Sequence, residues 1–170
     1  MNKDTTSKKR ILNYIVISAA ILWTGFIFSN SLQTASESLE QSGVFVTFFI
    51  NIAKTIYGNS IPAGLSRYIE LHLVEHIRSL AHIVEFFVLY LLAGRSFGSF
   101  HKIRRVYTHA FLYGLIVMAI DETIQIFVDG RGFQIKDLAL DTLGMTFALV
   151  LIILVRYLKF KKVKIKPTIP

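Results

Sequence analysis

Cysteine is absent from the 170 residues, and the three prolines are Pro62, Pro167 and Pro170. Without cysteine the chain forms no disulfide and offers no thiolate as a nucleophile or metal ligand. Acids are also scarce, with 11 Asp and Glu against 19 Lys and Arg. A positive balance often indicates nucleic-acid binding, but these basic residues lie in two tails and one loop beside apolar runs, which is the pattern of membrane topology. We therefore expect no nucleic-acid partner.

Hydrophobic residues make up 53% of the chain, and the mean hydropathy of +0.52 is high for a soluble domain. Long apolar runs predict four membrane spans, at residues 11–28, 77–94, 107–128 and 138–155. The first run follows a basic start, as in a cleaved signal peptide, but it is longer than a signal core and no clear A-x-A site follows. The fold class we predict is all-α, an integral membrane four-helix bundle at residues 11–155, with basic tails at 1–10 and 156–170.

A shorter apolar segment lies between the first two spans. In residues 43–57, Phe45, Phe48, Phe49, Ile52 and Ile56 recur at helical spacing and form one apolar face. At about 15 residues the segment is short for a span. We expect an interfacial or re-entrant helix that is broken at residues 58–60, with Pro62 in the first turn of the next helix.

The distribution of charge predicts the topology. Four basic residues lie in the N-terminal tail, four in the 95–106 loop and six in the C-terminal tail. Four spans place these three segments on one side, which the positive-inside rule makes cytoplasmic. We therefore expect a multi-pass protein of the cell membrane with both termini in the cytoplasm. The C-terminal lysines are expected to meet anionic lipid headgroups.

Polar residues gather in the outer segments and outer halves of the spans, where the predicted topology puts ten of the 11 acids. Charged groups inside a span are costly and usually face a protein interior or a wet cavity. We predict a polar pocket between the helices, open to the outer face. The candidate residues are Ser29, Gln33, Arg78, His82, Glu85, Asp121, Glu122, Gln125, Arg131, Asp137 and Asp141.

Two interpretations of these residues stay open. Carboxylates beside a histidine are able to form a binding or acid–base site. Alternatively the same groups form a structural network that ties the helices together, with Arg131 as the counter-ion. Ser29 and Gln33 also fit a simple helix end, and Asp137 fits an N-cap.

A second histidine motif is a weaker candidate. His72-Leu-Val-Glu-His76 matches H-x-x-E-H, a zinc-peptidase signature in which two histidines one turn apart share a metal. A five-residue pattern recurs by chance, and an amphipathic interfacial helix explains it more simply. The sequence therefore names no cofactor, and His72 and His76 are weak metal candidates.

Three blocks of the sequence resemble the VanZ-like family of bacterial membrane proteins. They are FSNSLQ at 28–33, AHIVEFFVLYLL at 81–92, and DETIQIFVDGRGFQIKDLALDTLG at 121–144. The resemblance implies a four-helix membrane protein of a Gram-positive bacterium, associated with resistance to the glycopeptide teicoplanin. The chain departs from the family in its basic residue, because Arg78 lies four residues before His82 rather than close to it.

The sequence is compatible with two functions and disfavours a third. The first is an envelope protein that binds a cell-wall or lipid-linked component in the outer pocket and so alters glycopeptide susceptibility. The second is a membrane-embedded hydrolase or transferase that acts on a lipid-linked substrate at the outer leaflet. A carrier or channel is disfavoured, because the cytoplasmic halves of the spans are almost purely apolar and no polar path crosses the membrane.

Overall fold

A computed structural model describes residues 3–57, 63–98 and 103–164 of the chain. This part is helical apart from short turns, so the all-α prediction is confirmed. The expected break at residues 58–60 and Pro62 lie outside the described residues. The five helices are α1 (Lys3–Ser31), α2 (Ala35–Tyr57), α3 (Ala63–Phe97), α4 (Ile103–Ile126) and α5 (Ile135–Lys164).

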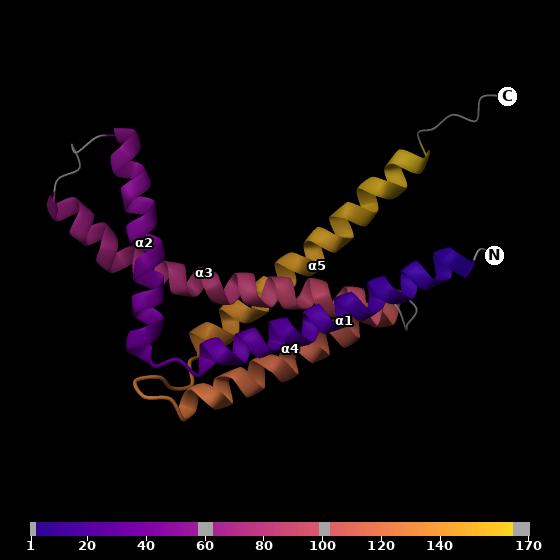
Figure 1. Ribbon diagram of the computed structural model, residues 1–170, viewed down its shortest axis with the longest axis horizontal. Coiled ribbons are helices and arrows are strands. Elements are labelled where there is room, and N and C mark those ends of the chain that lie inside the picture. Colours follow the sequence, from indigo (N-terminus) through magenta and orange to yellow (C-terminus); the bar gives the residue numbers. More distant parts are fainter. Residues whose placement is uncertain (1–2, 58–62, 99–102, 165–170) are drawn as a thin grey trace.

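Helix α3 is the centre of the bundle, because it packs against each of the other four helices and most extensively against α5. Helices α1 and α4 run alongside it, and α5 crosses it (Figure 1). The N- and C-terminal ends lie at the same end of the bundle. The turn between α4 and α5 lies at the opposite end, close to the start of α2.

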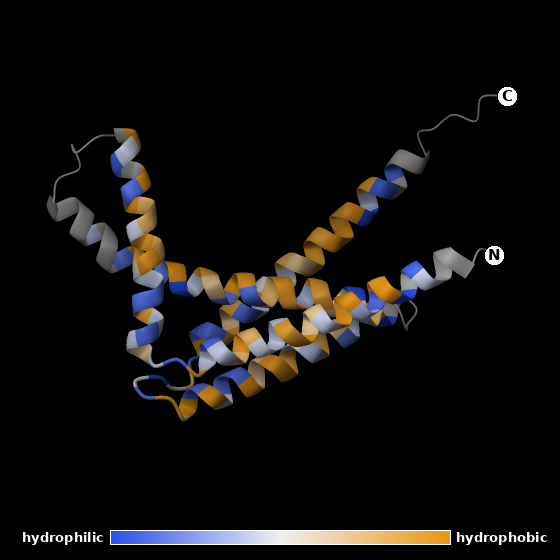
Figure 2. Cartoon of the chain, in the orientation of Figure 1, coloured by the Kyte–Doolittle hydropathy of each residue, from blue (hydrophilic) through white to orange (hydrophobic). Residues whose placement is uncertain are grey.

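Four helices are long and apolar enough to cross a membrane, and they confirm the four predicted spans. At about 1.5 Å per residue, their segments of 22, 26, 22 and 25 residues each exceed the ~30 Å hydrocarbon core. Apolar residues concentrate along these helices, whereas hydrophilic residues gather near the α4–α5 turn (Figure 2). The four segments are Arg10–Ser31, His72–Phe97, Arg105–Ile126 and Ile135–Lys159.

Glycine allows α3 and α5 to approach closely. A methyl group on Gly144 would collide with the backbone carbonyl of Ile83, so the two backbones are nearly in contact at this point. The same helix pair buries Phe86 and Met145 completely. This close packing fixes the relative position of the polar residues that α3 and α5 carry one to two turns away.

Helix α2 differs from the other four in direction, because it runs steeply across the bundle at the end that holds the α4–α5 turn (Figure 1). Its buried stripe, Val46 and Ile50, is distinct from the predicted apolar face. Phe45 and Phe48 on that face are each 59% exposed, which suits contact with lipid rather than with the bundle. This arrangement favours an interfacial helix over a re-entrant one.

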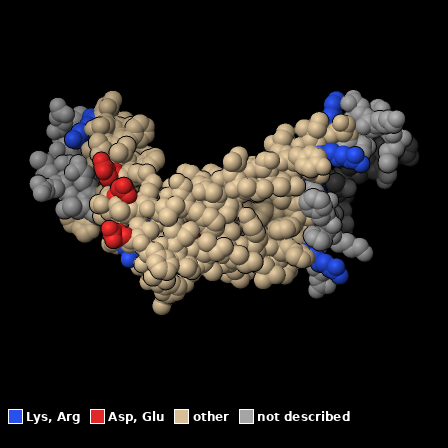
Figure 3. All heavy atoms as spheres, turned by 60° about the horizontal axis from the view of Figure 1, so that its bottom comes forward, with Lys and Arg blue, Asp and Glu red and all other residues tan. Residues whose placement is uncertain are grey.

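Charged side chains gather at the two ends of the molecule. In the space-filling view, Lys and Arg appear at the end that holds the termini and also at the opposite end (Figure 3). Asp and Glu appear at that opposite end, and the surface between the two ends is without charge. This uncharged band agrees with the four membrane spans, and the end that carries the acids is the one that the predicted topology places outside.

Candidate functional site

Helix α3 supplies the basic side of the site. Arg78, His82 and Glu85 are spaced at i, i+4 and i+7, so they share one face of the helix. His82 is buried with 7% exposure, and the other two are half-buried. Because this face is turned toward α1, α4 and α5, the histidine meets acids from neighbouring helices rather than lipid.

Helix α5 supplies two buried carboxylates to His82. Nδ1 of His82 lies 3.0 Å from Oδ1 of Asp141, and Nε2 lies 3.7 Å from Oδ2 of Asp137. The same Asp137 oxygen is 3.7 Å from Nη2 of Arg78, so Arg78 is its ion-pair partner. Asp137 is in the first turn of α5, not at the N-cap as one interpretation held, because its N–H already bonds to the carbonyl of Gln134. Its charge still favours the helix N-terminus.

Helix α4 supplies Asp121 and Gln125, which lie one turn apart and are both 1% exposed. Nε2 of Gln125 donates to Oδ2 of Asp121 at 2.9 Å, and the Ser31 hydroxyl of α1 donates to Oδ1. Both oxygens of Asp121 are therefore held by neutral donors. Glu122 points elsewhere: its Oε2 accepts the backbone N–H of Gln134 at 2.9 Å and so fixes the start of α5.

Arg131 has a different partner from the one predicted. Its Nη1 donates to the carbonyls of Asn30 and Ser31 at 3.1 and 3.4 Å, and its Nη2 donates to Ser38 Oγ at 3.3 Å. It thus caps the C-terminus of α1, whose last carbonyls lack helical partners. No carboxylate of the described residues forms a direct ion pair with Arg131, but the charges of Asp121, Asp137 and Glu85 act on it, so its interpretation as the acids' counter-ion stays a prediction. Burial lowers the pKa of Arg131, as does the charge of Arg78.

Helix α1 contributes residues that the sequence did not single out. Nδ2 of Asn30 donates to Oε1 of Glu85 at 2.6 Å, and Nε1 of Trp23 donates to the Glu85 carbonyl at 2.9 Å. Ser29 is exposed and faces away from these groups, so the prediction that it belongs to the pocket is wrong. The helical phase offers the missed signal, because Trp23, Ile27 and Ser31 are four residues apart and form the inward stripe.

A cavity of about 590 Å³ lies among these helices. Seven of the predicted residues line it: Gln33, Arg78, His82, Glu85, Asp121, Gln125 and Arg131. Glu122, Asp137 and Asp141 lie behind this lining. Its rim is apolar: Phe26, Phe45 and Val84 are 47%, 59% and 46% exposed, so the mouth opens sideways between α1, α2 and α3.

A comparison with known families decides the relationship. The profile of the VanZ/LLP1 family matches residues 16–156, which is most of the chain and overlaps all four spans. The chain belongs to the VanZ/LLP1 family. No curated protein and no solved structure matches it significantly. The membership confirms the resemblance stated above.

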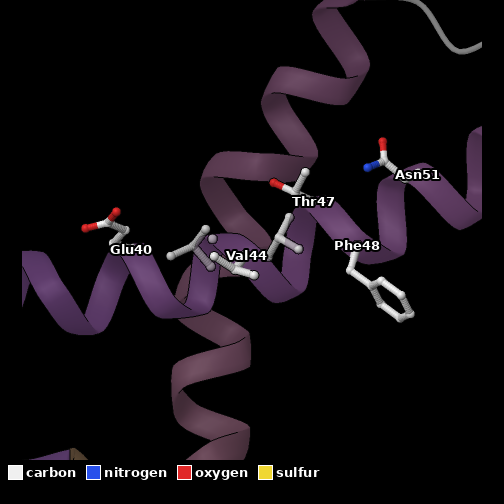
Figure 4. A pocket seen from close by; sticks show the side chains of 8 residues that line it. Glu40, Val44, Thr47, Phe48 and Asn51 are labelled. Carbon is white, nitrogen blue, oxygen red and sulfur yellow. The ribbon is translucent and has the colours of Figure 1, made fainter.

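A second hollow of about 630 Å³ lies on α2 of this VanZ/LLP1 protein, where α3 crosses behind it. Figure 4 shows Glu40, Thr47 and Asn51 along one side of α2, with Phe48 turned to the other side. Glu40 is the single titratable residue of its lining. It is an open surface groove, and the candidate site residues lie around His82 instead.

The group around His82 also has the donor atoms that a metal ion needs. His82, Asp121 and Asp141 each offer one donor atom, and the three atoms lie within 4.8 Å of one another. His72 and His76, the weak candidates from the sequence, are both exposed on α3, and Tyr68 stacks near His72. They are not in the metal-capable group found among the described residues.

Proposed function

We propose that this VanZ/LLP1 membrane protein binds an amphiphilic, lipid-linked component of the cell envelope in the cavity around His82, and thereby contributes to glycopeptide resistance, in particular to teicoplanin. The observation that carries the proposal is the two-part lining of the cavity. A polar floor of His82, Glu85 and Asp121 meets an apolar rim that includes Phe26 and Phe45. A molecule with a polar head and a hydrocarbon tail fits both parts.

The direction of the mouth supports the same conclusion. Small-molecule pockets bury most of a ligand and fix it with a few polar groups. Here the exposed rim side chains lie on membrane-spanning helices and on α2, so they are able to contact lipid tails. A ligand thus enters from the outer leaflet, and its headgroup reaches the floor without its tail leaving the membrane.

The test is a variant that fills the mouth without touching the floor. Val84→Trp places a large ring at the rim, and Val150→Trp is the matched control, because Val150 is 55% exposed on α5 and lies outside the cavity lining. In a susceptible Gram-positive host, the wild type and Val150→Trp should raise tolerance to teicoplanin more than to vancomycin, and Val84→Trp should not. An unchanged teicoplanin response with confirmed membrane expression of the wild type would refute the proposal.

One observation favours an enzyme as the second candidate. The His82–Asp141 contact resembles the arrangement in which a carboxylate orients a histidine that acts as a general base. A hydrolase or transferase for a lipid-linked substrate would convert the lipid that it binds. Mass spectrometry of co-purified lipids separates the two: an enzyme accumulates unconverted lipid in His82→Gln, whereas a binding protein carries the same lipid in both forms.

A further inference from the structure

Four buried side-chain oxygens in and behind the lining of the cavity have no hydrogen-bond partner among the described residues, and they belong to Glu122, Gln125, Asp137 and Asp141. Two of them are Oδ2 of Asp141, in a residue with no exposed surface, and Oε1 of Gln125, in a residue with 1% exposure. Buried polar oxygens are almost always satisfied, and an unsatisfied one costs roughly as much as a lost hydrogen bond. Both atoms are acceptors, so the missing partner is a donor or a cation.

The charges of the surroundings point to a cation. Five carboxylates gather here, and we call them the acid cluster: Glu85, Asp121, Glu122, Asp137 and Asp141. In the described part of the chain, only Arg78 and Arg131 lie among them as permanent cations, and Arg131 is engaged with backbone carbonyls. Unpaired charges are costly in a dry interior, so the excess negative charge requires bound protons or a positive ion.

The donor set is suited to a metal. From His82, Asp121 and Asp141, the structure brings one imidazole nitrogen and two carboxylate oxygens within 4.8 Å of one another. Zinc binds such donors at ~2.0–2.2 Å in tetrahedral geometry, so two of its ligand atoms are about 3.5 Å apart, and the most distant pair must close by up to about 1.3 Å. We propose that these three residues bind a divalent transition-metal ion of the Zn²⁺ or Mn²⁺ class.

The neighbouring groups already hold the ligands as in known metal sites. Metal-binding side chains are usually oriented by hydrogen bonds from a second layer of residues. Ser31 and Gln125 donate to the two oxygens of Asp121, and each oxygen keeps a further lone pair for a metal. Gln125, which holds Asp121, also has a buried amide oxygen without a hydrogen-bond partner.

The site faces the cavity, because His82 and Asp121 both line it. Three protein ligands leave coordination positions open, which is the arrangement of a catalytic or ligand-binding metal rather than a structural one. A headgroup oxygen or a water molecule fills such a position. The proposed metal site does not depend on the proposed lipid ligand, because its three ligands are side chains of the protein itself.

The experiment measures Zn²⁺ and Mn²⁺ binding to the purified full-length protein in detergent after treatment with a chelator. Isothermal titration should give one saturable site per chain. Asp141→Asn should weaken binding at least tenfold, because it removes the charged ligand and keeps the side-chain shape. Glu122→Gln is the matched control, since it removes an equally buried charge of the acid cluster outside the three ligands; it should change affinity less than about threefold.

Outcomes on either side are decisive. The proposal is overturned if the wild type shows no saturable site for either ion, or if Asp141→Asn and Glu122→Gln weaken binding equally. His82→Gln serves as the second ligand variant if Asp141→Asn fails to keep its helical circular dichroism. A protein that binds no metal but still confers the Val84-dependent teicoplanin response would leave the proposed function standing, so the two failures are distinguishable.

Discussion

Removing the Arg131 side chain should loosen the end of the bundle that holds the α4–α5 turn. Its guanidinium joins three elements: the α4–α5 turn that carries it, the last carbonyls of α1, and Ser38 of α2. We expect Arg131→Ala to lower thermal stability more than the loss of one surface charge would. The reason is that the carbonyls of Asn30 and Ser31 lose their donor at a place with little access to water.

The magnitude follows from the bonds that are lost. Hydrogen bonds from a charged group contribute ~1.5–3 kcal/mol, and the bond to Asn30 at 3.1 Å is the best of the three. The favourable position of a cation at a helix C-terminus overlaps with that contribution and is not added to it. A loss of about 2–3 kcal/mol corresponds to a fall of about 5–10 °C in melting temperature for a chain of this length.

Lys136→Ala is the matched control, because it removes the same charge a few residues away. Lys136 pairs with Glu75 at 3.9 Å, and the two side chains are 57% and 75% exposed. Such surface pairs contribute ~0–1 kcal/mol, so its melting temperature should fall by less than about 3 °C. Melting in detergent is followed by circular dichroism. Equal shifts for the two variants would refute the capping role of Arg131.

Three further expectations concern packing, capping and topology. Gly144→Ala should destabilise the α3–α5 pair by ~1–3 kcal/mol, seen as lower melting, whereas Gly25→Ala should not, because nothing lies within 4 Å of its added methyl. Thr34→Ala should cost about 1 kcal/mol at the start of α2, where Thr34 and Glu37 exchange hydrogen bonds, and hydrogen exchange there should quicken. The hydrogen bonds from Thr34 lower the pKa of the Glu37 carboxyl. The stability that this carboxylate contributes is therefore present above the unfolded pKa and is lost as the pH falls through the folded pKa. Glu37→Gln should remove this acid dependence of stability. Reporter fusions should be extracellular at position 131 and cytoplasmic at positions 100 and 165, and an extracellular C-terminus would contradict the topology.

The spans and much of the site follow from sequence because they depend on local regularities. Long apolar runs must be helical in a membrane, since every backbone group needs an internal partner. Spacings of three and four residues place Arg78, His82 and Glu85 on one face of a helix, and Asp137 and Asp141 on another. The family blocks then relate these faces to one another.

The remainder depends on partners that sequence does not display. Arg131 donates hydrogen bonds to backbone carbonyls. Every residue has such a carbonyl, so the sequence does not indicate which residues accept these bonds. The choice between Ser29 and Ser31 depended on the rotation of α1 relative to α4, which is set by packing at Ile27. The predicted apolar face of α2 exists, but it points away from the bundle. The sequence did not indicate this direction, because contact with lipid and contact with protein both favour apolar side chains.

The thermal stability of a variant in the acid cluster distinguishes a functional site from a structural network. A network kept for packing would satisfy its members, yet Asp141 is fully buried, has a free oxygen and lies near other acids. Breaking a true structural ion pair costs ~3–5 kcal/mol, so in that case Asp141→Asn would melt about 6–20 °C lower. We expect the opposite in the presence of a chelator: the asparagine still accepts the contact with His82 and removes an uncompensated charge, so the variant should melt at least as high as the wild type. Functional sites often hold groups poorly arranged for stability, and a large loss of stability in Asp141→Asn would assign this carboxylate to the structural network instead.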